Sequence, residues 1–342
     1  MASEENHKSS QKCLARIKRD SAFSMRLGDP ERDGKIVQMV ALPDGLYSVA
    51  ERAIYRAVLA DNIDPDFSHP NTPHVNQKFA GAGADNPIVS QTLLQAAHLF
   101  SSQHFDELTC EQALKSVVAG MQELLGAEDI LLKLQRDLKS TEVDLLNHHD
   151  GTMALPSVGD IEVRGKAFIQ RAEHALQALY QLAVVFFDDN RKPGFFDGVA
   201  QHVRTNFSDH PEFVVFADSL AKLAKLIRGL RHSIEHRNPN QQLDFLDYHF
   251  DAGRLHRPGM RVVHPDVPFE PTPLDVFMKI IIADLLEAFE SLIVFLAAVH
   301  VTSFGKLKVT VGRHPRFGEN DVRVKFTYFI AMGDPPRWHL LG

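Results

Sequence analysis

The chain has 342 residues, of which 44% are hydrophobic and 24% charged, and this composition excludes disordered, collagen-like and disulfide-scaffold proteins. With 37 Lys and Arg against 44 Asp and Glu, its formal net charge of -7 argues against a protein that coats nucleic acid or lies on an anionic membrane. The 18 histidines are an unusually large number and direct attention to metal binding or acid–base chemistry.

Three further features of the sequence indicate the cellular compartment of the protein. The two cysteines, Cys13 and Cys110, lie far apart without a CxxC pair, which disfavours a zinc finger or a secreted disulfide fold. The polar residues 1–10 lack the apolar segment of a secretory signal. The most apolar stretch, residues 277–301, carries charges that suit the wet face of an amphipathic helix better than a bilayer. These charged residues are Lys279, Asp284, Glu287 and Glu290. The sequence therefore predicts a cytoplasmic protein with no membrane segment.

The first part of the chain, residues 1–86, is expected to be an N-terminal arm with one helix and a linker. A short apolar run at 36–42 indicates one strand. Apolar residues at helical spacing predict a helix over 45–59. Prolines, asparagines, aspartates and glycines predict a linker over 61–87.

Residues 87–301 are dominated by helical periodicity and are expected to form a helical bundle. Pro87 stands just ahead of the first helix of this bundle, at a position where proline is favoured. A β-hairpin at about 242–264 interrupts this pattern, because its two arms alternate in polarity and turn residues lie between them. Helices are predicted over 88–103, 109–147 (broken near Gly126), 162–187, 195–206, 211–237 and 274–300.

The last segment, residues 302–342, is expected to be a short β tail with strands over 307–311 and 322–330. The predicted fold is therefore mainly α. It is a helical bundle with a β-hairpin insertion before the last long helix and a small C-terminal β appendage.

The segment that carries chemistry is the end of the helix predicted over 211–237. At about 100° per residue, four of its polar side chains fall within roughly a quarter-turn, with Arg231 just beside them. These four are Arg228, His232, Glu235 and His236. A separate apolar stripe anchors the helix, so its polar face is free to bind a ligand or to remain solvated. The stripe consists of Leu223, Ile227, Leu230 and Ile234. Asn238 and Pro239 end the helix.

One short segment, Arg231 to His236, reads Arg-His-Ser-Ile-Glu-His. It resembles the Arg-x4-6-His motif of HEPN-domain proteins, in which a polar residue often follows the arginine. HEPN domains are helical bundles with this motif near the end of one long helix, and the resemblance covers residues 88–300 in architecture. It implies a metal-independent endoribonuclease that needs no cofactor and acts as a homodimer on RNA. It also implies a place in toxin–antitoxin or antiviral defence systems, where an antitoxin or other regulatory protein would be a partner.

The chemistry of RNA cleavage explains why these residue types are suitable. Attack by the 2′-hydroxyl requires a base, the leaving 5′-oxygen requires an acid, and the phosphorane requires fixed positive charge. Under the resemblance, His236 would act as base or acid, Arg231 would stabilise the transition state and His232 would position the substrate. The supporting residues would be Arg228, Glu235 and Arg237. Glu235 would orient an imidazole or pair with Arg231 one turn away. One chain offers too few such groups facing one way, so a dimer belongs to the hypothesis.

Two other interpretations of the segment remain open. In the first, it belongs to a non-catalytic helical interaction protein, and the polar helix end binds a partner or simply packs. In the second, His232, Glu235 and His236 form the H-x-x-E-H motif of a zinc-dependent hydrolase, with zinc on the two histidines and Glu235 as general base. That site needs a third ligand. The candidates for it are Glu287, Glu290 and Glu319.

Overall fold

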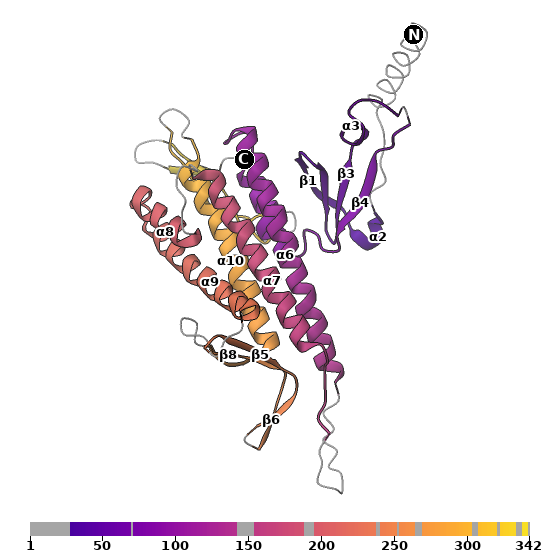
Figure 1. Cartoon of the computed structure of the whole chain (residues 1–342). Coiled ribbons are helices and arrows are strands. Elements are labelled where there is room, and N and C mark those ends of the chain that lie inside the picture. Colours follow the sequence, from indigo (N-terminus) through magenta and orange to yellow (C-terminus); the bar gives the residue numbers. More distant parts are fainter. Residues whose placement is uncertain are drawn as a thin grey trace, which may run out of the picture. The chain divides into compact units, whose positions relative to one another are not determined.

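The fold is described from a computed structural model (Figure 1). The structure describes residues 28–69, 71–141, 154–187, 195–236, 240–251, 253–263, 269–302, 307–319, 322–332 and 337–340. The chain divides into two compact units. Unit 1 consists of Met1–Ser90 and Pro315–Lys325, and unit 2 consists of Gln91–His314 and Phe326–Gly342.

The prediction of a mainly α protein with a small β appendage is wrong. The protein is about 53% helical and 22% strand, so it is mixed α/β. Within the described part of the chain, the strands form four small antiparallel sheets rather than one hairpin and a tail. Short apolar runs fit the buried face of a helix or of a strand equally well, and pairing with a neighbouring strand decides which of the two forms.

Unit 1 contains a four-stranded antiparallel sheet in the order β1-β2-β3-β4. The strands are β1 (Ile36–Leu42), β2 (Gly45–Ala50), β3 (Ile54–Val58) and β4 (Val75–Ala80). The short helices are α2 (Pro30–Asp33), α3 (Ala60–Ile63) and α4 (Pro87–Val89). Pro87 opens α4 as predicted, and the Asn86 side chain accepts the Ile88 N–H at 2.7 Å.

The strand predicted over 36–42 is confirmed as β1. The helix predicted over 45–59 is wrong, because β2 and β3 occupy this segment and pair with each other. Five of the six residues of β2 are buried, so both of its faces are covered and it lacks the alternation that marks a strand. The linker predicted over 61–87 contains β4, which pairs with β3 at the edge of the sheet.

Asp33 holds α2 against this sheet. Its carboxylate accepts hydrogen bonds from the Asp29 N–H at 2.9 Å and the Tyr55 hydroxyl at 2.7 Å, and it lies 3.1 Å from Lys78 Nζ. The Asp29 N–H, with Tyr55 and Lys78, holds the pKa of Asp33 far below its usual value. The buried carboxylate therefore stays ionised and joins α2 to β3 and β4.

In the described part of unit 2, four long helices lie side by side and enclose the main core (Figure 1). They are α6 (Glu107–Ser140), α7 (Ile161–Phe186), α9 (Pro211–Glu235) and α10 (Leu274–His300). The shorter helices are η1 (Ser90–Leu94, a π-helix that begins in unit 1), α5 (Gln95–Leu99) and α8 (Phe195–Asn206). Large side chains fill the space between the long helices, among them Phe168, Phe213, Phe289, Leu124 and Leu292.

The helices predicted over 162–187, 195–206 and 274–300 are confirmed as α7, α8 and α10. The break predicted near Gly126 is wrong, since α6 runs through it unbroken. A single glycine costs a helix only about 1 kcal/mol relative to alanine, which the buried face of α6 easily offsets. The helix predicted over 88–103 ends earlier, at the end of α5.

The charged residues of α10 do not all face water. Lys279, Asp284 and Glu287 are exposed as predicted, but Glu290 is 5% exposed and lies inside the bundle, so its predicted wet position is wrong. No helix in the described ranges is both long enough and apolar enough to cross a membrane.

Three small antiparallel sheets complete the described part of unit 2, in the orders β5-β8-β9, β6-β7 and β10-β11-β12. Their strands are β5 (Gln242–Leu246), β6 (His249–Asp251), β7 (Arg254–His256), β8 (Gly259–Val263), β9 (Phe269–Pro273), β10 (Val309–Arg313), β11 (Phe326–Met332) and β12 (Arg337–Leu340). The predicted hairpin is confirmed in the pairing of β5 with β8, but β6 and β7 form a second hairpin in its loop. The two strands predicted in the tail correspond to β10 and β11, each shifted by a few residues, and β12 was not predicted.

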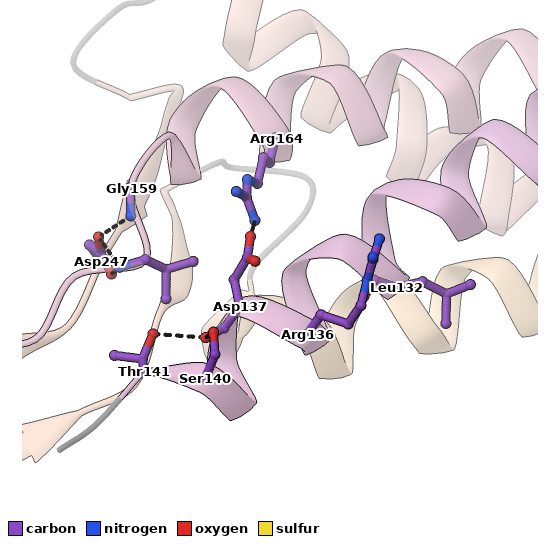
Figure 2. Close-up of polar contacts among 9 residues, drawn as sticks. Leu132, Arg136, Asp137, Ser140, Thr141, Gly159, Arg164 and Asp247 are labelled. Carbon is purple, nitrogen blue, oxygen red and sulfur yellow. Dashed lines mark hydrogen bonds and ion pairs between the residues drawn. The ribbon is translucent and has the colours of Figure 1, made fainter.

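Polar contacts join the C-terminal end of α6 to the start of α7 (Figure 2). Arg164 of α7 donates to Asp137 of α6 at 2.6 Å. Asp247, between β5 and β6, accepts the backbone N–H of Gly159 at 3.1 Å. It also accepts a hydrogen bond from the Ser157 hydroxyl at 2.7 Å. Desolvation on its own would raise the pKa of Asp247, but the hydrogen bonds from Ser157, Gly159 and neighbouring amides outweigh it and lower this pKa. The ionised carboxylate therefore ties the segment before α7 to the β5–β6 connection.

Candidate functional site

A pocket of about 440 Å³ lies along the C-terminal half of α9. Its walls come from α7, α8 and α9 and from Gln241, next to β5. The lining includes His232, three cations and three carboxylates. These charged residues are Lys225, Arg228, Arg231, Glu173, Asp197 and Glu235. The pocket therefore contains many charged groups, which balance in formal charge when the histidine is neutral.

Arg231 is held between two carboxylates. Its Nη2 atom lies 2.5 Å from Glu235 Oε1, one turn further along α9, and its Nε atom lies 3.6 Å from Glu173 Oε2 on α7. Glu173 in turn accepts a hydrogen bond from Gln177 at 3.0 Å. Because Arg231 and Glu173 are only 24% and 18% exposed, water screens this contact less than it screens a surface pair. The guanidinium is thus fixed in orientation and its charge is largely compensated.

The two histidines of the segment are in ring contact. The centroids of His232 and His236 lie 4.7 Å apart, with the rings inclined by 48°. Residues four apart face the same side of a helix, which explains the contact. His236 is the C-cap of α9, and its backbone N–H donates to the His232 carbonyl at 2.8 Å. Both side chains are exposed, but only His232 lines the pocket.

Arg228 lies on an aromatic surface that the sequence did not reveal. Its guanidinium carbon is 4.5 Å from the centroid of the Phe195 ring. Phe195 packs in turn against Tyr180 of α7, with centroids 4.9 Å apart, and against Phe196, with centroids 4.7 Å apart. The backbone φ of Phe195 is +54°, an uncommon value for a bulky side chain, and ring packing on several sides offsets its cost. The aromatic cluster therefore sets the position of the Arg228 guanidinium.

The structure brings most of the predicted site residues together. Arg228, Arg231, His232 and Glu235 line one pocket, and His236 adjoins it. Arg237 lies outside the described residues. Sequence reasoning missed Glu173, Asp197 and Phe195, which reach the pocket from α7 and α8. These residues belong to no local motif, and only the packing of α7 and α8 against α9 places them there.

The contacts of its proposed residues also bear on the interpretation of this segment as a zinc-dependent hydrolase. Glu235, which would be its general base, is paired with Arg231. Glu319, one of the proposed third ligands, pairs with Arg316 at 2.6 Å. Across the ranges that the structure covers, no three His, Cys, Asp or Glu side chains gather in an arrangement that could hold a metal ion.

Comparison of the chain with protein-family models, curated proteins and solved structures found no match.

Proposed function

We propose that the protein is a metal-independent endoribonuclease of the HEPN type, with its active centre in the pocket along α9. One observation carries this proposal. Arg231 and His232 line the same pocket, and the ring of His236 packs against that of His232. A fixed guanidinium beside imidazoles supplies the groups that cleavage by the 2′-hydroxyl of RNA needs.

In this reaction, a base takes the proton of the 2′-hydroxyl, and the 2′-oxygen attacks the adjacent phosphorus. The bond from phosphorus to the 5′-oxygen breaks, and that oxygen receives a proton from an acid. The products carry a 2′,3′-cyclic phosphate and a 5′-hydroxyl. His236 acts as base or acid, His232 binds the substrate within the pocket, and Arg231 stabilises the charge on the phosphorane.

A homodimer is part of this proposal because one chain presents its imidazoles on one side only. The centroids of His232 and His236 are 4.7 Å apart, which leaves no room for a phosphate held from both sides by hydrogen bonds of about 2.8 Å. We therefore place the second acid–base group on the equivalent helix end of a partner copy.

The test is an RNA cleavage assay in excess EDTA with the purified full chain. We expect cleavage by the wild type, loss of at least about a hundredfold in rate for His236→Ala, and no change for His210→Ala. His210 is a matched control, since it is an exposed histidine at the opposite end of α9. Cleavage that persists in His236→Ala, or that stops in EDTA, contradicts the proposal, and the second result favours the zinc hydrolase.

The second candidate is a non-catalytic interaction protein, in which α9 ends in a structural polar cluster. The pairing of Arg231 with both Glu173 and Glu235 favours it, because such a network also stabilises helix packing. A wild-type protein that is monomeric and inactive on every RNA tried supports this candidate over the nuclease.

A further inference from the structure

Two of the three cations in the pocket along α9 are not engaged by its carboxylates. Glu173 and Glu235 both approach Arg231. Among the residues that the structure describes, neither Lys225 nor Arg228 forms an ion pair with an acidic side chain. Both are exposed, and both line the pocket. Within the described part of the chain, the pocket cations without a carboxylate partner are therefore Lys225 and Arg228, whereas Arg231 has two.

The helix places these two cations on one face. They are three residues apart on α9, so they project in similar directions with an axial separation of about 4.5 Å. Arg228 is in addition held by the Phe195 ring beneath its guanidinium. A guanidinium that stacks on an aromatic face keeps its N–H groups free at the edge, where they can hydrogen-bond to a phosphate. The arrangement is suited to binding an anion with oxygen atoms.

We propose that Lys225 and Arg228 form a second phosphate-binding subsite, which takes the phosphodiester next to the one held at Arg231. This inference rests on the proposed nuclease function and specifies its substrate. Two neighbouring phosphodiesters must be engaged, so the preferred substrate has at least three nucleotides. We expect the substrate to be single-stranded, because its two phosphodiesters must reach Lys225, Arg228 and Arg231 in a pocket of only about 440 Å³.

Asp197, in the first turn of α8, also lines the pocket and is its third carboxylate. Its negative charge opposes a bound phosphate, in contrast to Lys225 and Arg228. This residue provides a test of opposite sign, because its replacement by asparagine removes repulsion without removing a hydrogen-bonding side chain.

The probe is fluorescently labelled dT4, a single-stranded oligonucleotide without the 2′-hydroxyl, so binding is measured without the proposed cleavage. We expect Arg228→Ala to weaken dT4 binding about tenfold, Lys225→Ala about threefold, and Asp197→Asn to strengthen it about threefold. Lys222→Ala is the matched control. Lys222 is an exposed lysine one turn before Lys225 that does not line the pocket, and its replacement is expected to change affinity less than twofold.

Three further measurements distinguish a specific phosphate subsite from non-specific attraction by positive charge. The plot of log affinity against log salt concentration should become shallower by about 0.7 for each lost phosphate contact in Arg228→Ala and Lys225→Ala. Wild type should bind dT4 more tightly than dT2, which has one phosphodiester, and Arg228→Ala should remove most of this advantage. Arg228→Lys keeps the charge without the planar donors and should lose affinity by an intermediate factor.

The inference is overturned if wild type does not bind dT4, or if Arg228→Ala and Lys222→Ala weaken binding equally. These outcomes are independent of catalysis. Normal dT4 binding with the expected variant effects but without RNA cleavage retains the subsite and rejects the nuclease. RNA cleavage with equal effects of Arg228→Ala and Lys222→Ala retains the nuclease and rejects the subsite.

Discussion

Glu173 of α7 lies 3.6 Å from the guanidinium of Arg231 on α9, and this contact joins the candidate site to the helical core. Arg231 is also paired with Glu235 on its own helix. The orientation of the arginine therefore depends on the packing of two helices as well as on the local motif.

The first prediction concerns this contact. Glu173→Gln removes the charge that faces Arg231 while preserving side-chain size, so the arginine loses part of its orientation. We expect RNA cleavage to fall about tenfold in kcat/KM and unfolding free energy to fall by about 1 kcal/mol. Steady-state kinetics and urea unfolding measure the two effects. Glu212→Gln, in the first turn of the same α9, is the control: it should leave kcat/KM unchanged and lower the unfolding free energy by no more than about 0.5 kcal/mol, because it removes only a carboxylate at the positive end of the helix.

The second prediction concerns two glycines inside long helices. The Phe245 ring of β5 packs directly on Gly165 of α7, where an added methyl group would overlap it. Gly165→Ala should therefore destabilise the protein by about 2 kcal/mol in urea unfolding. At Gly126 of α6, a methyl group would meet only the flexible end of Arg171. Gly126→Ala should be neutral or stabilise by up to about 1 kcal/mol, since alanine favours the helix. Equal effects at both positions would contradict this packing.

The third prediction concerns the pH dependence of Asp247. The pKa of this residue is lowered in the folded protein, so its contribution to stability is present above the unfolded-state pKa of about 3.9 and is lost as pH falls. Asp247→Asn should consequently destabilise the protein at pH 7, and the difference from wild type should shrink below about pH 4. Urea unfolding of both proteins across this pH range measures the difference in unfolding free energy.

Asp284 provides a control of opposite sign. Desolvation and the nearby Glu287 raise the pKa of Asp284, so the fold penalises the charged form of this side chain. Asp284→Asn is expected to stabilise the protein slightly at pH 7, and this gain should disappear in acid. Destabilisation by Asp284→Asn at pH 7 would show that the fold does not penalise the negative charge of Asp284, and it would contradict this prediction.

The fourth prediction concerns the histidines of the core. His98 lies 2.9 Å from the buried Thr327 hydroxyl, and desolvation, with nearby His314 and His104, lowers its pKa. The unfolded chain then binds more protons than the fold, so stability falls as pH drops below about 6.5. His98→Gln should lose less stability than wild type between pH 7.5 and 5.5. Urea unfolding across this pH range measures the difference between the two proteins, and an equal loss in both would contradict the prediction.

The long helices could be predicted from sequence because their apolar residues recur over many turns, as in Leu274–His300. Gly45–Ala50 could not, because both faces of this strand are buried and its pattern has no period of two. The same distinction applies to the site. Arg231 and Glu235 are four residues apart on one helix, as are His232 and His236, so these two contacts follow from helical geometry. Phe195 and Glu173 reach them only through packing between helices, which leaves no local signal.

The most direct test of the central proposal uses an oligonucleotide with one ribonucleotide in a DNA strand, incubated with the protein in EDTA. We predict one cut, directly 3′ of the ribonucleotide, with a 2′,3′-cyclic phosphate and a 5′-hydroxyl identified by mass spectrometry. The cut should be absent in His236→Ala and present in His210→Ala. Cleavage at DNA positions, products with a 5′-phosphate, or an intact strand with wild-type protein would contradict the proposed nuclease function.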